Sequence, residues 1–420
     1  MRKKMMCAVL MLFLFVAFAG NGWSEKLESK GVSFDRSSHT IMRPDLNTVQ
    51  KWIKAHRNAP QFSIDQRMMR TSSFMTSVDL LSHLQYTPSQ RDQGQCGNCW
   101  LWAGIGVMEI AHSVQDGVKD RLSIQHINSC YTNDGDYACC GGWLEDAATI
   151  YSSSRIAIPW SNISASFQDA SRTCNDGSSL ISCGSISTNP SYSITSISNV
   201  SISTYQVGQA TAVANIKSVL NQNKAVWLGF FLSNNSDWNA FFDHWDYQSE
   251  SDVFNFDYSN GHDWSDDEGG GHAVLIVGYD DSGVNPYWVV LNSWGTTAGR
   301  PNGLFRVAMN MNYDNYCIYE GAPDQNLFFE TLDIEFASGV TTTTSVPLCP
   351  TETLFGEHSE EAEVLRSVRD TILSQTPEGR EIIRLYYELS PVIVETMSED
   401  KEFKEQVKAM IGSVLQLFVK

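Results

Sequence analysis

Apolar residues follow several patterns along the chain, and each pattern predicts a different element. Short apolar runs bounded by turn-forming residues are typical of buried strands, and they occur at Ala225–Leu232, Ala273–Tyr279 and Tyr287–Leu291. A longer apolar stretch that begins at Cys99 indicates a buried helix, and a second helix is expected near Leu46–Arg57. Strands and helices are therefore both expected in the chain.

The composition of the chain changes towards its end. Residues 76–335 hold most of the cysteine, glycine and aromatic residues and predict one large domain, which residues 20–75 precede. The Thr-rich stretch within 336–349 indicates a linker. Apolar residues then recur at helical spacing over 350–420, which predicts a small helical module whose last helix is capped near Asp400.

Residues 1–19 have the features of an export signal. Three basic residues precede an apolar run over Met5–Phe18, and Ala17 and Ala19 provide the small side chains that a signal peptidase recognises. The run is shorter than the ~20 residues of a transmembrane helix. We therefore expect a cleaved signal peptide, a secreted or periplasmic protein and no integral membrane segment in the mature chain.

The net charge limits the class of partner. The 420 residues carry a formal charge of −19, which repels phosphate backbones and argues against a nucleic-acid partner. Acidic residues interleaved with aromatic ones are concentrated near 241–269. This stretch is expected to be an insertion, and a solvated loop anchored by its aromatic residues, a calcium site and a surface that attracts basic substrates all remain open.

The cysteine count points to disulfides and one special thiol. Ten cysteines are present, and Cys7 is lost with the signal peptide. Most of the remaining nine should pair in an oxidising compartment, but an odd number leaves at least one thiol free.

The sharpest chemical signal is the stretch Gln93–Trp100, which reads QGQCGNCW. A cysteine at the N-terminus of a helix feels the positive end of the helix dipole, which favours the thiolate at Cys99. Taken alone, Cys96 and Cys99 could equally be a CxxC redox pair or two structural disulfide partners.

Two distant residues favour nucleophilic catalysis. His272 stands at the head of one predicted strand, and Asn292 follows the end of the next. If the strands form a hairpin, imidazole and amide come together. A thiol, an imidazole and an amide that orients the imidazole are the parts of a cysteine nucleophile with its base.

Residues 76 to about 320 resemble the papain family of cysteine peptidases. That family carries the signature Cys-Gly-[Ser/Ala]-Cys-[Trp/Tyr] with His and Asn ~130–150 residues downstream. Here Asn98 replaces the small residue, and the separations from Cys99 are longer, so an insertion is expected. The further matches are Ser77–Leu80, Leu122–Gln125 before Cys130, Cys139–Gly142 and Asn292–Gly295.

The resemblance implies an α+β fold of two lobes, one helical and one rich in β-structure, and a role for each matching residue. Cys99 is expected to attack the scissile carbonyl, with His272 as its acid–base partner. Asn292 would orient the imidazole ring, Trp294 would shield that contact from water, and Gln93 would stabilise the oxyanion. Neither a cofactor nor a metal ion is implied.

The resemblance also implies how polypeptide substrates bind. Gly141 and Gly142 would hold the substrate backbone, while Trp143, Leu144 and Ala273 would line the pocket for the second residue before the cut. Those walls are apolar, so we expect hydrophobic selection there, and any preference for basic residues should be weaker and salt-sensitive.

The disulfide pairing comes from the same resemblance. Cys96 is expected to pair with Cys139, and Cys130 with Cys174. If Cys99 is the free nucleophile, the eight remaining cysteines could form four bridges, but the pairing within the last four stays open: Cys140, Cys183, Cys317 and Cys349.

Two regions flank the part that resembles papain. Residues 20–75 occupy the place of an inhibitory propeptide, although the spaced pattern of the family's longer propeptides is not visible. The region from Cys349 onwards resembles a helical module of some exported bacterial proteins, the CFI-box. It could be a packing module, or it could dock to a cell surface or a partner. For the whole chain, the alternative to an endopeptidase is a catalytically idle papain-fold binding or surface protein.

Overall fold

The computed structural model describes residues 39–63, 74–85, 87–133, 136–337, 350–356, 359–371 and 400–416, with single positions between 379 and 398. These residues belong to two compact units. The larger unit comprises the described residues from 39 to 337, and the C-terminal unit comprises those from 350 to 416. The expected signal peptide and most of the expected linker lie outside the described residues.

The larger unit is organised around a nine-stranded sheet. Its strands are β1 (Ser77–Asp79), β4 (Ile156–Ala157), β5 (Tyr192–Ser201), β6 (Val226–Leu232), β7 (Val253–Phe254), β9 (Gly270–Asp280), β10 (Tyr287–Leu291), β11 (Leu304–Ala308) and β14 (Leu327–Phe336). Their order is β4-β5-β14-β6-β9-β10-β11-β7, and β1 also pairs with β9. The three strands predicted from apolar runs are therefore confirmed as β6, β9 and β10.

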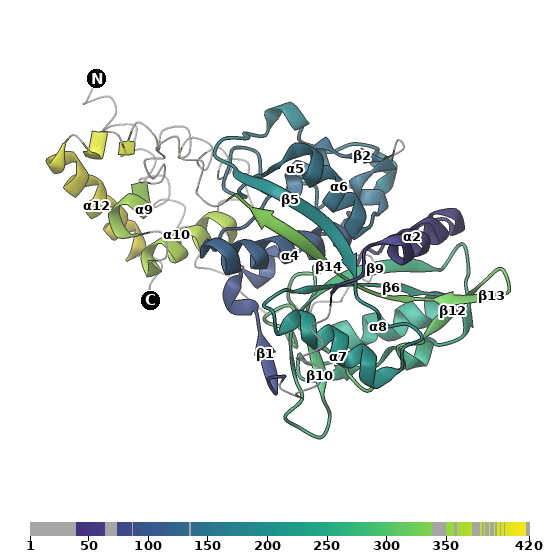
Figure 1. Ribbon diagram of the computed structural model, residues 1–420. Coiled ribbons are helices and arrows are strands. Elements are labelled where there is room, and N and C mark those ends of the chain that lie inside the picture. Colours follow the sequence, from purple (N-terminus) through teal and green to yellow (C-terminus); the bar gives the residue numbers. More distant parts are fainter. Residues whose placement is uncertain are drawn as a thin grey trace. The chain divides into compact units, whose positions relative to one another are not determined.

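Helices cover this sheet and complete the α+β fold. They are α2 (Leu46–Asn58), α4 (Cys99–Asp116), α5 (Ile124–Cys130), α6 (Leu144–Ser154), α7 (Gln209–Leu220) and α8 (Asn235–Tyr247). The long apolar helix α4 packs against β9 and β14, and α6 packs against β5 (Figure 1). Helices α4, α5 and α6 make up the helical part, and α4 meets the β-rich part along β9.

Short elements connect these parts. The 3-10 helices are η2 (Leu81–His83), η3 (Pro88–Gln90), η4 (Ala138–Cys140), η5 (Cys174–Asp176), η6 (Cys183–Ser185) and η7 (Phe256–Ser259). A three-stranded sheet has the order β13-β12-β8, and a hairpin joins the remaining two strands. Their bounds are β2 (Thr132–Asn133), β3 (Asp136–Tyr137), β8 (His262–Asp263), β12 (Tyr316–Tyr319) and β13 (Ala322–Gln325).

The N-terminal segment, residues 39–63, shares the hydrophobic core of the larger unit. The predicted helix is present as α2, and the Asp45 side chain caps it by accepting the Thr48 N–H at 2.7 Å. Its buried face consists of Val49, Trp52, Ile53 and His56.

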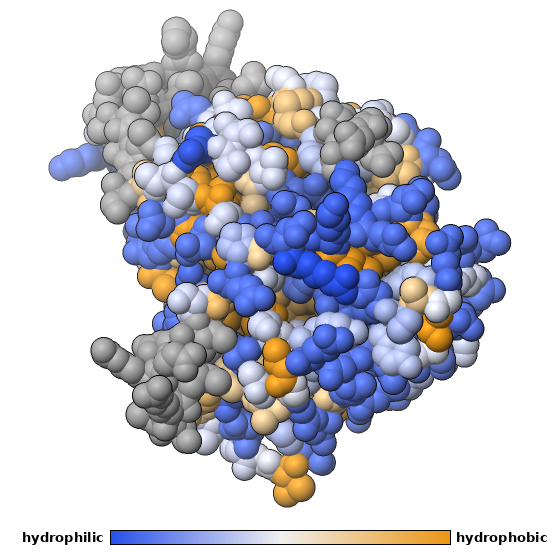
Figure 2. Space-filling model, turned by 45° about the vertical axis from the view of Figure 1, so that its right-hand side comes forward, coloured by the Kyte–Doolittle hydropathy of each residue, from blue (hydrophilic) through white to orange (hydrophobic). Residues whose placement is uncertain are grey.

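The face of the molecule drawn in Figure 2 is mainly hydrophilic, with apolar residues in separate small areas.

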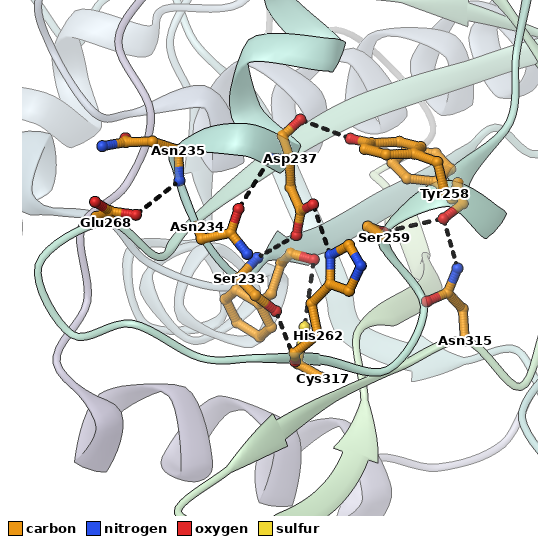
Figure 3. Close-up of polar contacts among 12 residues, drawn as sticks. Ser233, Asn234, Asn235, Asp237, Tyr258, Ser259, His262, Glu268, Asn315 and Cys317 are labelled. Carbon is orange, nitrogen blue, oxygen red and sulfur yellow. Dashed lines mark hydrogen bonds and ion pairs between the residues drawn. The ribbon is translucent and has the colours of Figure 1, made fainter.

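The acidic and aromatic stretch expected as an insertion is built into the same unit. It begins inside α8, and its aromatic side chains Phe241, Trp245, Phe254 and Phe256 are buried in the main core. Figure 3 shows the neighbouring carboxyl of Asp237 turned inward, where it accepts a hydrogen bond from His262 Nδ1 at 2.8 Å. Among the described residues, no group of three or more His, Cys, Asp or Glu side chains could hold a metal ion.

The C-terminal unit is helical, as the apolar spacing predicts. It contains α9 (Pro350–Phe355), α10 (Glu360–Thr371) and α12 (Lys401–Leu415). Asp400 caps α12 by accepting the backbone N–H groups of Glu402 and Phe403 at 3.1 Å. The unit has its own core of Ile393, Val394, Met397, Val407, Ile411 and Leu415. None of the described helices has both the length and the apolar character needed to cross a membrane.

Candidate active site

Cys99 is the first residue of α4 and is completely buried. The helix begins there because an apolar run follows directly, and it ends at Gly117, whose φ of 72° lies in the left-handed region that favours glycine. The Asn98 side chain, which departs from the family signature, donates to Asn128 Oδ1 at 2.9 Å. Neighbouring α5 therefore accommodates the unusual residue next to the thiol.

His272 and Asn292 meet as the predicted hairpin requires. Strands β9 and β10 pair antiparallel, and His272 Nε2 donates to Asn292 Oδ1 at 2.8 Å. The indole ring of Trp294 stacks on the imidazole with 4.5 Å between ring centroids. His272 Nδ1 has no hydrogen-bond partner among the described residues. The Asn292 contact and the Trp294 stacking thus fix the ring plane.

Gln93 is held in place by a residue that the sequence argument did not single out. Ser293 Oγ donates a hydrogen bond to Gln93 Oε1 at 2.7 Å, so the amide nitrogen of Gln93 points away from Ser293. That Nε2 donates to the backbone carbonyl oxygens of Cys96 at 2.7 Å and Thr40 at 3.1 Å. Ser293 directly follows Asn292, but no spacing rule links it to a residue two hundred positions earlier.

The start of the N-terminal segment lies over these residues. Met42 and Gly271 exchange two backbone hydrogen bonds of 2.8 and 3.0 Å, which places Met42 one residue from His272 in the antiparallel pairing. The Thr40 carbonyl accepts from both Gln93 and Trp294 Nε1, the latter at 3.2 Å.

The same segment is anchored beyond Thr40. The His39 ring stacks on Trp294 at 4.9 Å, and its Nε2 donates to Asp246 Oδ1 at 2.6 Å. No sequence pattern indicates the contacts of Thr40 with Gln93 and Trp294, because Thr40 acts through a backbone carbonyl that every residue type possesses. We call the arrangement with residues 39–58 over the site the covered state.

Burial changes the acid–base character of the site in the covered state. Burial raises the pKa of the Cys99 thiol to about 12, although the backbone N–H groups of Ala273 and Trp100 act in the opposite direction. Burial lowers the pKa of His272 to about 3, an effect that the hydrogen bond to Asn292 opposes. Low polarity disfavours both charged forms, so the covered state holds a neutral thiol beside a neutral imidazole.

The residues expected to bind substrate fall into two groups. A Cβ atom on Gly141 would lie 3.1 Å from the Trp52 ring and 3.3 Å from Met42, so this glycine faces the N-terminal segment. The Trp143 ring also faces the segment, with its centroid 5.6 Å from that of Trp52.

The second group faces the interior. A Cβ atom on Gly142 would lie 2.5 Å from the Trp100 ring, so this position needs glycine for close packing. Leu144 is fully buried and packs towards Gly104 of α4. Ala273 is buried on β9 opposite Gly229 of β6.

The disulfides confirm one expected pair and correct another. Cys96 bonds to Cys139, which excludes a redox pair with Cys99 and ties the start of α4 to the loop of Gly141. The expected bridge from Cys130 to Cys174 is wrong. Bonding requires Cα atoms within about 7 Å, and the fold brings η6 to α5 and η5 to η4. The pairs are therefore Cys130–Cys183, with 4.9 Å between Cα atoms, and Cys140–Cys174, with 4.3 Å.

One further thiol is free among the described cysteines. Cys317 is buried on β12 and has no disulfide partner among the described cysteines. Four bridges from the eight remaining cysteines would have needed Cys317 to be paired. Figure 3 shows it beside Ser233 and His262. Cys349 lies outside the described residues.

Comparison with known proteins identifies relatives of this arrangement. A family model described as papain family cysteine protease matches residues 75–324. Digestive cysteine proteinase 2 of Homarus americanus is 27% identical over 298 residues, which cover 70% of this chain and 80% of that protein. Cathepsin L of Sarcophaga peregrina is 30% identical over 244 residues, covering 57% of this chain and only 60% of that protein.

Solved structures resemble the chain more distantly. The ragweed pollen allergen Amb a 11, a cysteine protease solved in its proform, has a TM-score of 0.46 at 20% identity and covers 69% of this chain and 74% of its own. The bromelain protease of Ananas comosus has a TM-score of 0.40 at 20% identity, covering 61% and 98%.

Proposed function

The chain belongs to the papain family of cysteine proteases, and from this premise we propose that it is an exported endopeptidase made in a latent form. Its catalytic set would be Cys99, His272, Asn292 and Gln93. The observation that carries the proposal is a peptide carbonyl, that of Thr40, which accepts a hydrogen bond of 3.1 Å from Gln93 Nε2. A substrate carbonyl would need the same donor in the transition state.

The proposed reaction uses the paired residues in sequence. His272 accepts the thiol proton, and the Cys99 thiolate attacks the scissile carbonyl carbon. The Gln93 amide stabilises the oxyanion, and His272 then donates its proton to the leaving amine as the C–N bond breaks. Water, deprotonated by His272, hydrolyses the thioester and frees the thiol. Asn292 keeps the imidazole oriented throughout because its Oδ1 accepts a hydrogen bond from the Nε2–H group of His272.

Latency follows from the covered state. Thr40 takes up the oxyanion donor, and burial keeps thiol and imidazole neutral, which removes the ion pair that attack requires. We propose that residues 20–75 act as a propeptide. Release would need a cut between Met68 and Val78, near Arg70, in a stretch that lies largely outside the described residues.

Export is supported by the cysteines. Disulfides persist in oxidising compartments, and three are present among the described residues. We propose that the signal at 1–19 directs the chain there. Mass spectrometry of the secreted or periplasmic protein should find a mature N-terminus near Gly20.

A single substitution tests the proposed nucleophile. Cys99→Ala should abolish hydrolysis of unfolded casein, and a thiol-reactive epoxide should label Cys99 in the activated wild type. Cys317→Ala is the matched control, since it removes the other free buried thiol among the described cysteines, and it should keep activity. Equal casein hydrolysis by wild type and Cys99→Ala would contradict the proposal and favour another catalytic centre. No hydrolysis by either protein after activation would instead favour the idle binding protein.

A further inference from the structure

A buried carboxyl group organises the side chains next to the N-terminus of α4. Asp169 belongs to the long connection between β4 and β5, and it has no exposed surface. Its Oδ2 accepts three hydrogen bonds, from Asn128 Nδ2 at 2.6 Å, from Gln125 Nε2 at 2.9 Å and from the Tyr137 hydroxyl at 2.9 Å. Its Oδ1 accepts the backbone N–H of Leu180 at 2.8 Å. Both carboxyl oxygens are therefore satisfied.

Asp169 is charged in spite of its burial. Burial by itself raises the pKa of this carboxyl, but hydrogen bonds, with those from Asn128 and Leu180 foremost, outweigh burial and lower the pKa below its usual value. A carboxylate can only accept hydrogen bonds. Every group that faces its Oδ2 must therefore be a donor, and this requirement fixes which way round each neighbouring amide lies.

The orientation is passed on from Asn128 to Asn98. Because Asn128 donates its Nδ2 to Asp169, its Oδ1 lies on the other side, where it accepts a hydrogen bond from Asn98 Nδ2 at 2.9 Å. All three side chains are buried. Asn98 is the residue that departs from the papain signature, so this contact does not follow from that signature.

Asn98 directly precedes a backbone donor at the proposed nucleophile. It is the N-cap residue of α4, and Cys99 is the first residue of that helix. The N–H of Cys99 has no acceptor within the helix, because the first four N–H groups of a helix lack one. Burial raises the pKa of the Cys99 thiol, and this N–H is among the backbone groups that oppose the shift, so it lies close to the sulfur. A donor at this position would join Gln93 Nε2 in stabilising an oxyanion.

The residue after Asp169 holds the other end of the same loop. The Ala170 carbonyl accepts the backbone N–H of Gln95 at 2.6 Å. Gly94 has a φ of 59°, and a Cβ atom there would lie 2.2 Å from the same carbonyl oxygen, so the loop and the connection are in close contact. Asp169 and Ala170 therefore hold both ends of the loop that separates the two proposed oxyanion donors, one end directly and the other through a side chain.

We propose that Asp169 is a positioning residue for the oxyanion site. Acting through Asn128 and Asn98, it holds the peptide plane before Cys99 and so directs the N–H of that residue. This inference rests on the proposed peptidase function and adds to it a residue from outside the papain signature. Loss of the connection should affect the transition state, where the oxyanion exists, more than the binding of the substrate.

Two substitutions break the connection at different points, and both are assayed in the full chain after activation. Asn98→Ala removes the last donor and introduces a residue type that the papain signature allows. Asp169→Asn introduces a group that can donate, so Asn128 is no longer forced to turn its oxygen towards Asn98. Each should lower kcat on a fluorogenic peptide by about tenfold, less than the ~10²–10³-fold loss when a donor is removed, and leave KM within about threefold.

Two thiol reagents distinguish a misdirected donor from a damaged site. A peptide aldehyde adds the thiol to its carbonyl carbon, and the hemithioacetal oxygen then needs the oxyanion donors. Its inhibition constant should therefore rise by the factor by which kcat/KM falls. Iodoacetamide forms a bond between sulfur and carbon with loss of iodide and creates no oxyanion, so its rate of alkylation should stay within about twofold. Active-site titration with the thiol-reactive epoxide fixes the enzyme concentration.

A double variant shows whether the residues act as one unit. If Asp169 works through Asn98, the double variant should have a kcat no lower than that of the weaker single variant, because coupled positions are not additive. If Asp169→Asn does not fold, Asn128→Ala takes its place in this comparison, since it breaks the same connection between Asp169 and Asn98.

Two further variants are matched controls. Asp237→Asn and Asn215→Ala change residues of the same types that are also buried and hydrogen-bonded, on α8 (Figure 3) and α7. Neither helix contributes to the loop before α4. Both variants should keep kcat and the affinity for the aldehyde within about twofold of wild type.

The outcomes separate this inference from the peptidase function. An unchanged kcat in Asn98→Ala would overturn the positioning role, whether or not Asp169→Asn folds. Equal losses in aldehyde affinity and in the rate of alkylation would also overturn it, because they would show that the whole thiol site is disturbed. Losses that add up in the double variant would do the same. An activated wild type with no hydrolysis and no titratable thiol would instead contradict the peptidase function itself.

Discussion

The N-terminal segment and the C-terminal unit both contain helices, and in sequence they flank the residues that match the papain family, but they are stabilised differently. Helix α2 buries Val49, Trp52 and Ile53 in the core of the larger unit. Helix α12 buries its apolar residues in a core that the C-terminal unit makes for itself. Because α2 packs in the core of the larger unit, its unfolding should affect the function of that unit. The C-terminal unit has a core of its own, so it can unfold without affecting the larger unit.

Cutting the chain on either side of the larger unit should give the largest contrast. A specific protease site placed within 66–71 would release the N-terminal segment, and the same site within 338–349 would release the C-terminal unit. The first cut should raise casein hydrolysis by about a hundredfold or more, as expected when a site open in ~1% of molecules becomes mostly open. The second should change it by less than about twofold. Equal effects of both cuts would remove the distinction between the two regions.

Core substitutions should separate the regions without cutting. Trp52→Ala removes the ring that stacks on Trp143 and Phe231, at a cost of about 3–5 kcal/mol to the covered state. The uncut chain should then hydrolyse peptides about ten to a hundred times faster than uncut wild type. Ile411→Ala removes a core side chain of the C-terminal unit and should lower the melting temperature of that unit alone. If the Trp52→Ala chain stays latent, contacts other than those of this ring stabilise the covered state.

Acid should loosen the N-terminal segment and not the C-terminal unit. The pKa of His272 is lowered from 6.5 to about 3 in the covered state. In the Cys99→Ala chain, where no thiolate can pair with the imidazole, the uncovered site therefore binds a proton below pH 6.5 that the covered site does not. The stability of the covered state of that chain is complete above pH 6.5 and falls by up to about tenfold in equilibrium constant per pH unit towards pH 3. In the chain with Cys99 the stability should also fall above pH 9, because burial raises the pKa of the thiol from 9.0 to about 12 in the covered state.

Hydrogen exchange in the inactive Cys99→Ala chain measures the acid effect directly. After correction for intrinsic exchange rates, the amides of α2 should exchange faster at pH 5 than at pH 7, and those of α12 should not. His272→Gln removes the titrating group and should flatten the response of α2. Protection of α2 that is independent of pH in the chain with His272 would show that this imidazole is not coupled to the cover.

The smallest effect compares two equivalent helix caps. Asp45 caps α2 and Asp400 caps α12, each through backbone N–H groups of the first turn. Replacing either by Ala costs about 1 kcal/mol. Asp45→Ala should therefore raise the activity of the uncut chain by about fivefold, and Asp400→Ala should leave it unchanged while lowering the stability of the C-terminal unit. Peptide hydrolysis measures the activity of both variants, and circular dichroism melts measure their stability. Higher activity of Asp400→Ala with no change in Asp45→Ala would contradict the prediction.

Most of the proposed catalytic set could be predicted because its signals are local. The cysteine at a helix start, the histidine at a strand head and the asparagine after the next strand each follow from a short stretch of sequence. The contact between His272 and Asn292 then required only the shortest connection in a sheet, a hairpin. The pairing of Cys130 could not be obtained in this way, because several cysteines compete for it and only the fold sets their distances.

The strands around His272 and Asn292 and the helix that presents Cys99 can be predicted from short stretches of sequence, since apolar periodicity acts over a few residues. Three other contacts become visible only when the chain is folded: Thr40 with Gln93, Ser293 with the same amide, and His56 with Glu330. These contacts join residues 53 to 274 positions apart. They depend on backbone groups and on burial, which leave no periodic trace in the sequence because any residue type provides a carbonyl and any glutamate can be exposed or enclosed.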